Sequence, residues 1–381
     1  MTHPSFLPRD WQDAILVGRI DLGEGPTPVL VKNGQVMDVS ATAPTVSQFL
    51  EGWNGVVPQG RVLGDIADFG FAPAWDGGKG RARLLAPIDL HCVKACGVTF
   101  AVSAIERVIE ERAKGVPGRA QAIREELAAK IGTDIKSVVP GSPEAAKLKE
   151  ALIAEGLWSQ YLEVAIGPDA EVFTKAPPLS AVGWGELIGV RSKSTWNNPE
   201  PEVVVVVDRN GRVVGATLGN DVNLRDYEGR SALLLGEAKD NNASTAVGPF
   251  IRLFDDKFTM DDVRGAVVEL EILGADNYRL EGKSTMTEIS RDPLDLVGQT
   301  MAEHQYPDGF VLFLGTLFAP TQDRDQPGFG FTHKEGDVVR ISTPRLGVLE
   351  NRVTTSRAAP PWVFGIADLM KNLVKRSLLK A

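Results

Sequence analysis

Two glutamates and one aspartate are the residues of this chain whose spacing most clearly indicates chemistry. Glu200 and Glu202 lie two positions apart just before a run of five valines, so on a strand their side chains point to one face. The run is followed by Asn210-Gly211, a dipeptide typical of a tight turn between paired strands. A turn centred on this dipeptide places Asp221 directly opposite Glu200. The sequence therefore predicts three carboxylates on one face of a hairpin.

Three carboxylates at the open end of an apolar hairpin repel one another and raise each other's pKa. A hard divalent cation relieves this repulsion, and a ligand set made only of oxygen atoms favours Mg²⁺, Mn²⁺ or Ca²⁺ over zinc. The alternative is a rim of solvated acids at a strand end, without a metal. The predicted register favours the metal, and we expect a site for Mg²⁺, with Mn²⁺ as the alternative ion.

The composition is that of an ordinary folded protein and narrows the class of partner. With 381 residues, 43% of them hydrophobic and 24% charged, the chain is long for one core, so two domains are expected. Its 41 basic and 50 acidic residues give a formal charge of -9, which argues against nucleic acid as a partner. The longest apolar stretch, residues 310–320, is too short to span a bilayer, and the N-terminus lacks the features of a signal peptide. We therefore expect a cytoplasmic protein with no nucleic-acid or membrane partner.

The chain contains two cysteines, Cys92 and Cys96. No second pair of Cys or His ligands lies nearby, so a zinc site is not predicted. We interpret them as thiols buried near a strand, and such low cysteine use is typical of a reducing compartment.

The order of the expected elements predicts an α+β fold. Residues 1–80 are interpreted as a small N-terminal α/β domain that ends in a turn-rich linker, and residues 81–381 as the metal-binding catalytic domain. The pattern turns helical at about 103–162, which we interpret as a helical insertion, and Ser142-Pro143-Glu144 carries the start signals of one of its helices. Strands dominate elsewhere, without the strand–helix alternation of a doubly wound fold. Further helices are expected near residues 46–53, 231–235, 293–302 and 364–379.

The carboxylates also belong to a longer pattern. Glu200-Pro201-Glu202 followed by Gly219-Asn220-Asp221-Val222-Asn223-Leu224-Arg225-Asp226 resembles the E-x-E…N-D-x-x-x-R-D signature of the fumarylacetoacetate hydrolase superfamily. Further matches occur in the right order between about residues 83 and 353, at 84–87, 173–178, 239, 248–249, 314–316 and 336–353. The resemblance implies a roll of mixed β-sheets with a metal at its mouth, held by Glu200, Glu202 and Asp221. It also implies a 2-oxo acid or diketone as the chelated substrate, and a homodimer or homotetramer.

The same resemblance implies roles for residues outside the three carboxylates. Arg225 and Glu228 would line the pocket. Lys239 would contact the enolate oxygen of the substrate, and Gly315-Thr316 would hold its carboxylate. Simpler interpretations exist: Arg225 pairs with Asp226 or Glu228, Lys239 is solvated, and Thr316 is an ordinary strand residue. The matched order of the motifs favours the functional roles.

One departure from the family pattern bears on the reaction. Hydrolases of the superfamily carry a pattern like G-L-N-Y-x-x-H-x-x-E, whose histidine activates water for carbon–carbon cleavage. Residues 97–106 of this chain place Ser103 where that histidine stands and keep Glu106. Serine does not act as a general base near neutral pH without a partner that takes its proton. Ser103 and Glu106 also have the spacing of a capping box, so the alternative is that they start a helix. None of the four histidines takes the missing position in sequence, and His304 is expected to support a loop.

The departure and the helical insertion together resemble the dehydratase branch of the superfamily, as do segments 156–163, 193–198 and 319–325. That resemblance implies a Mg²⁺-dependent hydro-lyase for a 2-keto-3-deoxy sugar acid, foremost 2-keto-3-deoxy-D-xylonate. The products would be 2,5-dioxopentanoate and water, formed by enolate-mediated loss of the C4 hydroxyl.

The implied reaction assigns a proton or a contact to several side chains. Lys239 or Glu106 would take the C3 proton, and Glu106 would help the C4 hydroxyl leave, with Ser103 beside it. Lys175 or Arg225 would secure the polar tail of the substrate. Two other functions stay open: a carbon–carbon hydrolase of an acylpyruvate-type acid, and a non-catalytic binder of a metal or a 2-oxo acid.

Overall fold

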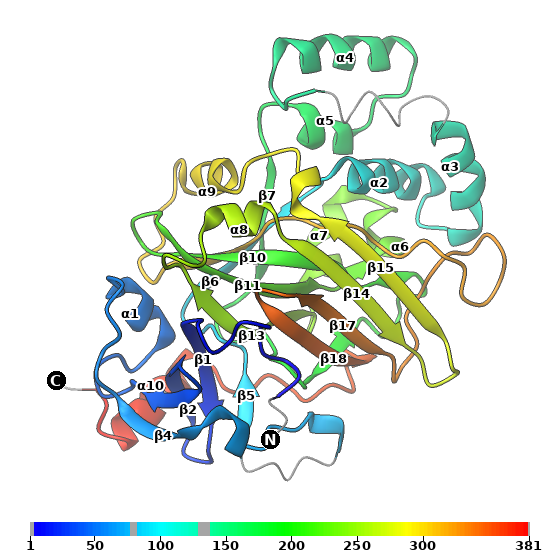
Figure 1. The fold of residues 1–381 in the computed structure, drawn as a ribbon. Helices are drawn as coiled ribbons and strands as arrows, with labels where there is room; N and C mark the ends of the chain where they lie inside the picture. The colour runs from blue at the N-terminus through cyan, green and yellow to red at the C-terminus, as the bar shows by residue number, and fades with distance from the viewer. Residues whose placement is uncertain (1–3, 77–81, 129–137, 380–381) are drawn as a thin grey trace.

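The computed structural model describes residues 4–76, 82–128 and 138–379. Within these residues the chain forms an eleven-stranded sheet, a five-stranded sheet and a two-stranded ribbon, with the helices around them (Figure 1). Both larger sheets contain parallel as well as antiparallel pairs. Mixed sheets with helices set to the outside make the fold α+β, as predicted.

The strands are ordered in space as follows. The large sheet consists of β4 (Arg61–Asp65), β3 (Gln35–Asp38), β2 (Pro26–Lys32), β1 (Leu16–Asp21), β13 (Thr245–Leu253), β11 (Val213–Asp221), β10 (Pro201–Val207), β16 (Phe310–Phe313), β6 (Cys92–Gly97) and β7 (Glu171–Ala176), while β5 (Arg83–Leu85) pairs with β1. The smaller sheet consists of β15 (Arg279–Thr285), β14 (Val267–Leu273), β17 (Val338–Thr343), β18 (Gly347–Thr355) and β8 (Leu187–Val190). The ribbon pairs β12 (Asn223–Leu224) with β9 (Asn197–Asn198).

Most α-helices of the described residues lie close to predicted positions. The helices are α1 (Val46–Glu51), α2 (Ala101–Ala113), α3 (Ala120–Ala128), α4 (Pro143–Ala154), α5 (Gln160–Ile166), α6 (Arg225–Glu228), α7 (Leu235–Lys239), α8 (Met260–Arg264), α9 (Pro293–Met301) and α10 (Ile366–Lys375). None of these helices has both the length and the apolar character that crossing a membrane would need. The short helices α6 and α8 were not predicted.

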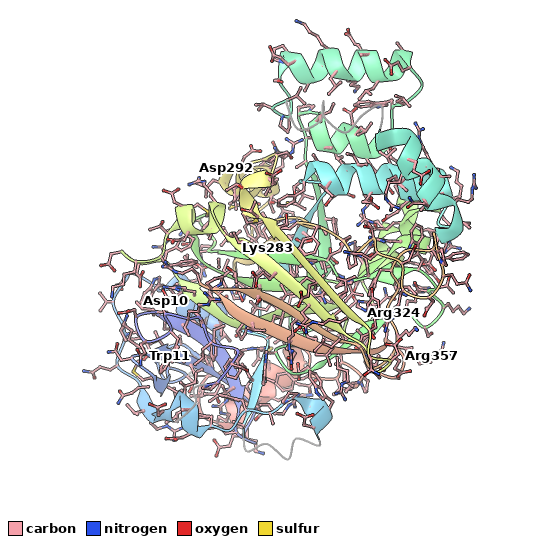
Figure 2. All side chains as sticks on the ribbon, turned by 45° about the vertical axis from the view of Figure 1, so that its right-hand side comes forward. Asp10, Trp11, Lys283, Asp292, Arg324 and Arg357 are labelled. Carbon is pink, nitrogen blue, oxygen red and sulfur yellow. The ribbon has the colours of Figure 1, made fainter. Side chains whose placement is uncertain are left out.

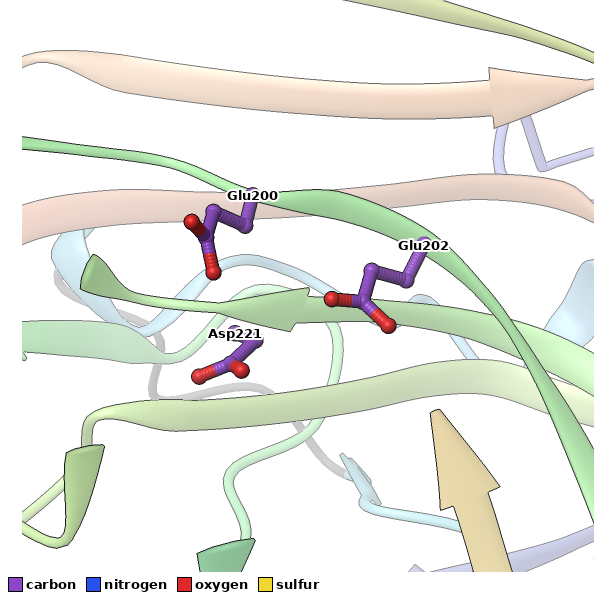
Figure 3. A group of neighbouring side chains, drawn as sticks. All are labelled: Glu200, Glu202 and Asp221. Atoms are coloured by element: carbon purple, nitrogen blue, oxygen red, sulfur yellow. The ribbon is translucent and has the colours of Figure 1, made fainter. Parts of the chain in front are cut away.

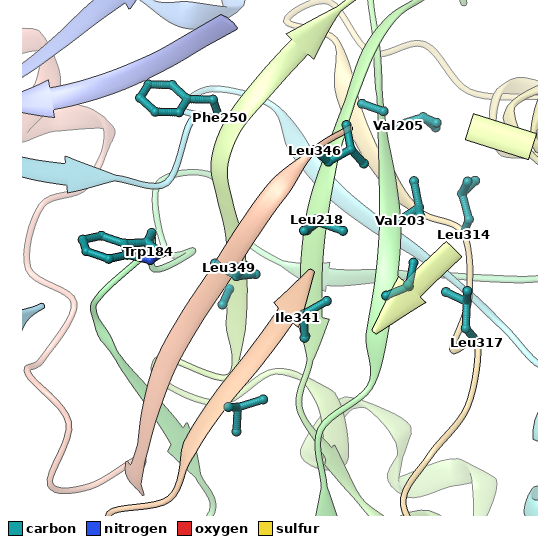
Figure 4. Close-up of a cluster of buried hydrophobic side chains, with 14 of the residues drawn as sticks. Trp184, Val203, Val205, Leu218, Phe250, Leu314, Leu317, Ile341, Leu346 and Leu349 are labelled. Atoms are coloured by element: carbon teal, nitrogen blue, oxygen red, sulfur yellow. The ribbon is translucent and has the colours of Figure 1, made fainter. Parts of the chain in front are cut away.

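Strand β10 is buried on both faces, which is why its sequence reads as uninterrupted valine. Val203 and Val205 pack into the core between the two sheets, together with Ile341 of the smaller sheet (Figure 4). Val204 and Val206 pack into a second core on the opposite face of β10. Fully burying one such side chain is worth about 1.5–3 kcal/mol, so this strand is a rigid support for whatever stands at its end.

The N-terminal strands continue the large sheet instead of forming a separate layer. β1 pairs with β13 through Leu16 and Val17, and Asp10 binds the buried guanidinium of Arg252 on β13 at 2.6 Å (Figure 2 labels Asp10). The predicted boundary at residue 80 lies outside the described residues. The division into domains at that point stays a prediction.

The helical insertion consists of α2 to α5 and stands at one end of the sheets (Figure 1). It begins slightly earlier than predicted, at Ala101. The predicted start of α4 is confirmed, because Ser142 accepts a hydrogen bond from the amide of Ala145 and Pro143 occupies the first turn. Residues 129–137, within the predicted insertion, lie outside the described residues.

Candidate metal centre

Three buried carboxylates meet at the end of the β10–β11 hairpin. Glu200 directly precedes β10, Glu202 lies on β10, and Asp221 is the last residue of β11. Each side chain offers an oxygen atom, and these atoms all lie within 4.8 Å of one another (Figure 3). All three residues are at most 2% exposed. A rim of solvated acids, the alternative interpretation of these residues, is therefore wrong.

The register that brings them together is the predicted one, although the turn differs. The pairs from Pro201–Asn220 to Val206–Gly215 follow the prediction, and the Asp221 amide donates to the carbonyl of Glu200 at 3.1 Å. At the turn end Val207 pairs with Val213, one residue out of that register. The turn is thus wider than Asn-Gly alone predicts, and a β-bulge restores the register before the strands reach the site.

Two buried lysines neutralise part of the carboxylate charge. Lys239 Nζ lies 2.5 Å from Glu200, 3.1 Å from Asp221 and 3.6 Å from Glu228. Lys175 Nζ lies 3.0 Å from Asp221. Lys239 is 3% exposed and Lys175 is fully buried, so the interpretation of Lys239 as a solvated side chain is wrong.

No lysine or arginine among the described residues forms an ion pair with Glu202. Its carboxylate accepts hydrogen bonds from the Gly315 amide at 2.7 Å and the Thr316 hydroxyl at 3.3 Å. Burial, together with the charges of Asp221 and Glu200, raises the pKa of Glu202 well above its usual range. A buried carboxylate beside two others, with only neutral donors, fits a hard divalent cation such as Mg²⁺ that would balance its charge.

An arginine on α2 closes the site from the helical side. Arg107 Nη2 lies 2.5 Å from Glu200, Nη1 lies 2.7 Å from Glu110, and Nη1 also contacts Glu228. Burial would raise the pKa of Glu200, but the charges of its two cationic partners outweigh burial and lower it. Arg107 was not predicted from the sequence.

The cavity over the carboxylates is small. Its walls come from β6, β7, β10 and β11 on the sheet side and from α2, α5, α6 and α7 on the helical side. Its volume is about 30 Å³, which leaves room for roughly two water molecules.

The two residues of the modified hydrolase pattern point in different directions. Ser103 lines the cavity, and its hydroxyl donates to the Thr316 carbonyl at 2.5 Å. Glu106 does not line it and binds Arg124 of α3 at 2.8 Å instead. The capping-box interpretation is wrong, because Phe100 is the N-cap of α2 and Ser103 lies inside the helix. A catalytic role for Glu106 stays a prediction that this arrangement does not support.

Glu171 on β7 is a cavity residue that the sequence analysis missed. It lines the cavity opposite α2, and burial, followed by the charge of Glu228, raises its pKa to about 7. Its carboxylate lies against Gly97, where a Cβ atom would come within 1.8 Å of Oε2. Glu171 lies on the same strand as Lys175, but the pairing of β7 with β6 shifts register between Thr174 and Ala176, so strand alternation does not relate the two side chains. The sequence therefore carried no simple signal for Glu171.

The remaining predicted residues divide between the cavity and its surroundings. Glu228 and Thr316 line the cavity, and Gly315 lies beside it through its bond to Glu202. Arg225 does not line it and binds Glu110 at 3.0 Å, rather than Asp226 or Glu228 as the simpler interpretation held. His304 is exposed and bonds the neighbouring Gln305 carbonyl at 2.9 Å, in keeping with a loop residue.

Residues 160–354, about half of the chain, match the C-terminal domain of fumarylacetoacetate (FAA) hydrolases. The chain belongs to this family. Its relatives within the family include a 2-dehydro-3-deoxy-D-arabinonate dehydratase of Saccharolobus solfataricus, 32% identical over 190 residues, and a probable 2-keto-3-deoxyxylonate dehydratase of Haloferax volcanii, 33% identical over 195 residues. The matches cover 49% and 51% of this chain, and 59% and 64% of the relatives, which is less than two thirds of their length. The predicted resemblance to the dehydratase branch is confirmed.

Solved structures share the fold over most of the chain. A 2-keto-3-deoxy-D-arabinonate dehydratase complexed with magnesium and 2,5-dioxopentanoate has a TM-score of 0.62 at 23% identity, covering 89% of this chain and 99% of that one. A fumarylacetoacetate hydrolase from Exiguobacterium antarcticum has a TM-score of 0.55 at 17% identity, covering 90% and 100%. Both branches of the family therefore use this architecture, and the fold alone does not distinguish their reactions.

Proposed function

We propose that the protein is a Mg²⁺-dependent dehydratase of a 2-keto-3-deoxy-D-pentonate. The observation that carries the proposal is the meeting of three buried carboxylates with Lys239, at a site where Ser103 replaces the water-activating histidine of the hydrolases. The two curated relatives, named as dehydratases of such acids, support the substrate class. The neighbour described with magnesium and 2,5-dioxopentanoate supports the ion and the product.

The two relatives are named after different parent sugar acids, but these names lead to the same substrate. A keto group at C2 and a deoxy C3 remove two stereocentres of a pentonate, so C4 is the only one left. The 2-keto-3-deoxy acids of D-xylonate and D-arabinonate are therefore one compound. The open questions are the configuration at C4 and the chain length, and we propose the D-series five-carbon acid.

The residues present would hold both the ion and the reacting end of the substrate. Glu200, Glu202 and Asp221 would hold Mg²⁺, which supplies the Lewis acidity that makes the C3 protons of a 2-oxo acid removable. Gly315 and Thr316 are proposed to hold the C1 carboxylate beside Glu202.

Lys239 is proposed as the base that takes a proton from C3. Burial alone would lower its pKa, but the charges of Asp221, Glu200 and Glu228 outweigh burial and raise it. Asp221 and Glu200 belong to the proposed ligand set, so a bound cation would weaken their hold on the lysine proton. Loading of the metal site would thus favour the neutral amine that a base requires.

Glu171 is proposed as the acid that protonates the departing C4 hydroxyl. With a pKa raised to about 7 it holds a proton near neutrality, where an ordinary glutamate has lost it. The C4–O bond breaks as the hydroxyl takes this proton and leaves as water, while the C3 proton goes to Lys239. A proton transfer from C5 to C3 and tautomerisation of the resulting enol then give the aldehyde of 2,5-dioxopentanoate.

The other charged residues are proposed to support this arrangement. Lys175 would fix Asp221 and Arg225 would fix Glu110, because each is fully or almost fully buried in contact with that carboxylate. Glu106 would fasten α2 to α3 through Arg124. Contact with the polar tail of the substrate is therefore assigned to Glu228, which faces the cavity.

The test uses 2-keto-3-deoxy-D-xylonate with Mg²⁺, and couples the product to a semialdehyde dehydrogenase so that NADPH formation is measured. We expect turnover that chelation of the metal abolishes, and much slower turnover of the C4 epimer from the L-series. Authentic 2,5-dioxopentanoate controls for the coupling enzyme. Absence of signal with a working control, or rapid hydrolysis of acetylpyruvate instead, would contradict the proposal.

A further inference from the structure

A second cavity lies beside the N-terminal strands. It is lined by residues of β1 and β5, of the loop that follows β7, and of the C-terminal segment before α10. Its volume is about 360 Å³, within the range of pockets for small molecules. It shares no lining residue with the cavity over the carboxylates, so a ligand here would not be part of the proposed reaction.

A buried arginine faces this cavity with part of its hydrogen-bonding capacity unused. Arg19 is 5% exposed, and its Nε donates to the Ala86 carbonyl at 2.8 Å. Among the described residues, no hydrogen-bond or ion-pair partner is found for its two terminal nitrogens. The buried guanidiniums of Arg252 and Arg324, by contrast, each bind a carboxylate. A guanidinium fixed by its Nε with two free terminal nitrogens presents the fork that binds carboxylate or phosphate oxygens.

The nearby acids do not neutralise Arg19 by contact. Asp89 accepts hydrogen bonds from the amides of Val46 and Ser47, at 2.6 and 3.0 Å. Glu186 binds Arg83 at 2.6 Å and the Gly183 amide at 2.8 Å. Each carboxylate is thus committed elsewhere, and a buried cation without a contacting counter-charge is costly unless a ligand supplies one.

The lining of the cavity also includes apolar side chains and an oriented indole ring. Trp362 is 46% exposed, and its Nε1 donates to the Phe364 carbonyl at 3.0 Å, which fixes the ring. Leu85, Leu179 and Val182 add aliphatic surface. Apolar side chains and one buried charge in the same cavity suit a flat molecule with an anionic end.

We propose that this cavity binds a small organic anion, with its carboxylate or phosphate on Arg19 and a planar apolar body against Trp362. The site is independent of the proposed dehydration. The cavity is partly open to solvent and larger than the cavity over the carboxylates.

The experiment uses the whole chain labelled with 5-fluorotryptophan, in which Trp362→Phe identifies the resonance of this indole. Benzoate, phenyl phosphate and the neutral isostere benzamide are titrated separately, and the fluorine shift is measured. We expect a saturable shift with at least one of the two anions and a dissociation constant at least about tenfold weaker for benzamide. The better of the two anions identifies the preferred headgroup.

Two variants locate the charge that binds the anion. Arg19→Gln should weaken binding of the better anion at least about tenfold, while Arg83→Gln at the rim, 61% exposed and paired with Glu186, should change it less than about threefold. Equal binding of benzamide and both anions, or no saturable shift with any probe, overturns the proposal. So does unchanged binding in a folded Arg19→Gln protein. If that variant does not fold, the contrast between anions and benzamide in the unmodified protein decides.

Discussion

The metal centre has two sides that are held in place by different kinds of interaction. We call Glu200, Glu202, Asp221 and Lys175, which lie on strands of the large sheet or directly beside them, the floor, and the α2 residues Ser103 and Arg107 the roof. The carboxylates of the floor stand at the end of β10 and β11, whose backbones are hydrogen-bonded to neighbours on both sides and whose side chains fill two cores, while Lys175 lies on β7 at the edge of the sheet. Among the residues that the structure describes, the roof contacts the floor through side chains, chiefly in the ion pair between Arg107 and Glu200.

This difference assigns a separate task to each side. A floor fixed by the sheet can hold ligand oxygens at constant spacing whether or not a cation is bound. A roof held by ion pairs to those same oxygens competes with the cation for them. Binding of metal and release of the roof should therefore be coupled, and variants on the two sides should change metal affinity in opposite directions.

The largest effect is expected from removing a floor carboxylate. Asp221→Asn should weaken Mg²⁺ binding at least about a hundredfold, more than loss of an outer-sphere partner usually costs, and abolish dehydration. Isothermal titration with Mg²⁺ measures the affinity. Asp240→Asn, an exposed acid next to Lys239 in sequence, is the matched control and should behave as the unmodified protein. Tight Mg²⁺ binding by Asp221→Asn would refute the ligand assignment.

The second largest effect is expected from loss of the proposed acid, Glu171. Glu171→Gln should lower kcat by about 10²–10⁴ with little change in Mg²⁺ affinity. Because burial raises the pKa of Glu171 to about 7, the carboxyl is protonated below that pH, and activity of the unmodified protein should fall as the pH rises through it. The pH profile of kcat/KM checks the sign.

Two further variants separate the acid role from a general effect on folding. Gly97→Ala should displace the Glu171 carboxylate and lower kcat in the same way, whereas Glu163→Gln, a partly exposed acid on α5, should leave the profile unchanged. An unaltered fall in activity near neutral pH in Glu171→Gln would assign the titration to another group.

A variant of the roof should bind Mg²⁺ more tightly than the unmodified protein, in contrast to a variant of the floor. Arg107→Gln removes a buried cation that binds Glu200, and should tighten Mg²⁺ binding about tenfold, since a hydrogen bond to a charged group is worth about 1.5–3 kcal/mol. Arg112→Gln changes the same helix outside the cavity and serves as control. Weaker Mg²⁺ binding in Arg107→Gln would show that the arginine supports the ligands instead of competing for them.

The smallest effect is expected at Ser103. Ser103→Ala removes one hydrogen bond to the Thr316 carbonyl, worth about 0.5–1.5 kcal/mol, and should lower kcat/KM by less than about tenfold. Ser194→Ala, a hydroxyl bound to Asp226 away from the cavity, is the control. A loss above a hundredfold would make Ser103 a catalytic residue in its own right.

The sequence predicts the floor better than the roof, because the floor depends on local strand patterns and the roof on tertiary packing. Alternation along a strand and the register of a hairpin are short-range properties, so Glu200, Glu202 and Asp221 could be placed from their spacing alone. The contacts of α2 depend on what packs against it. Arg124 of α3 turns Glu106 away from the cavity, and the carboxylates on the opposite side attract Arg107.

Part of the roof could nevertheless have been predicted from the sequence. Ser103, Arg107 and Glu110 recur at intervals of four and three residues, the spacing of one helical face. A family pattern that drew attention to Glu106 obscured this face. The role of Glu171 likewise needed the tertiary structure, because its raised pKa arises from burial between segments distant in sequence.

The bulge in the β10–β11 hairpin has a practical consequence for engineering the chain. It lies between the turn and the six regular pairs from Pro201–Asn220 to Val206–Gly215, several of which are also bonded to β13 or β16. A peptide inserted after Arg209, which is exposed, would lengthen a turn that is already out of step with those pairs. We therefore expect that a reporter or an affinity tag can be inserted in this turn without changing the spacing of the ligand oxygens.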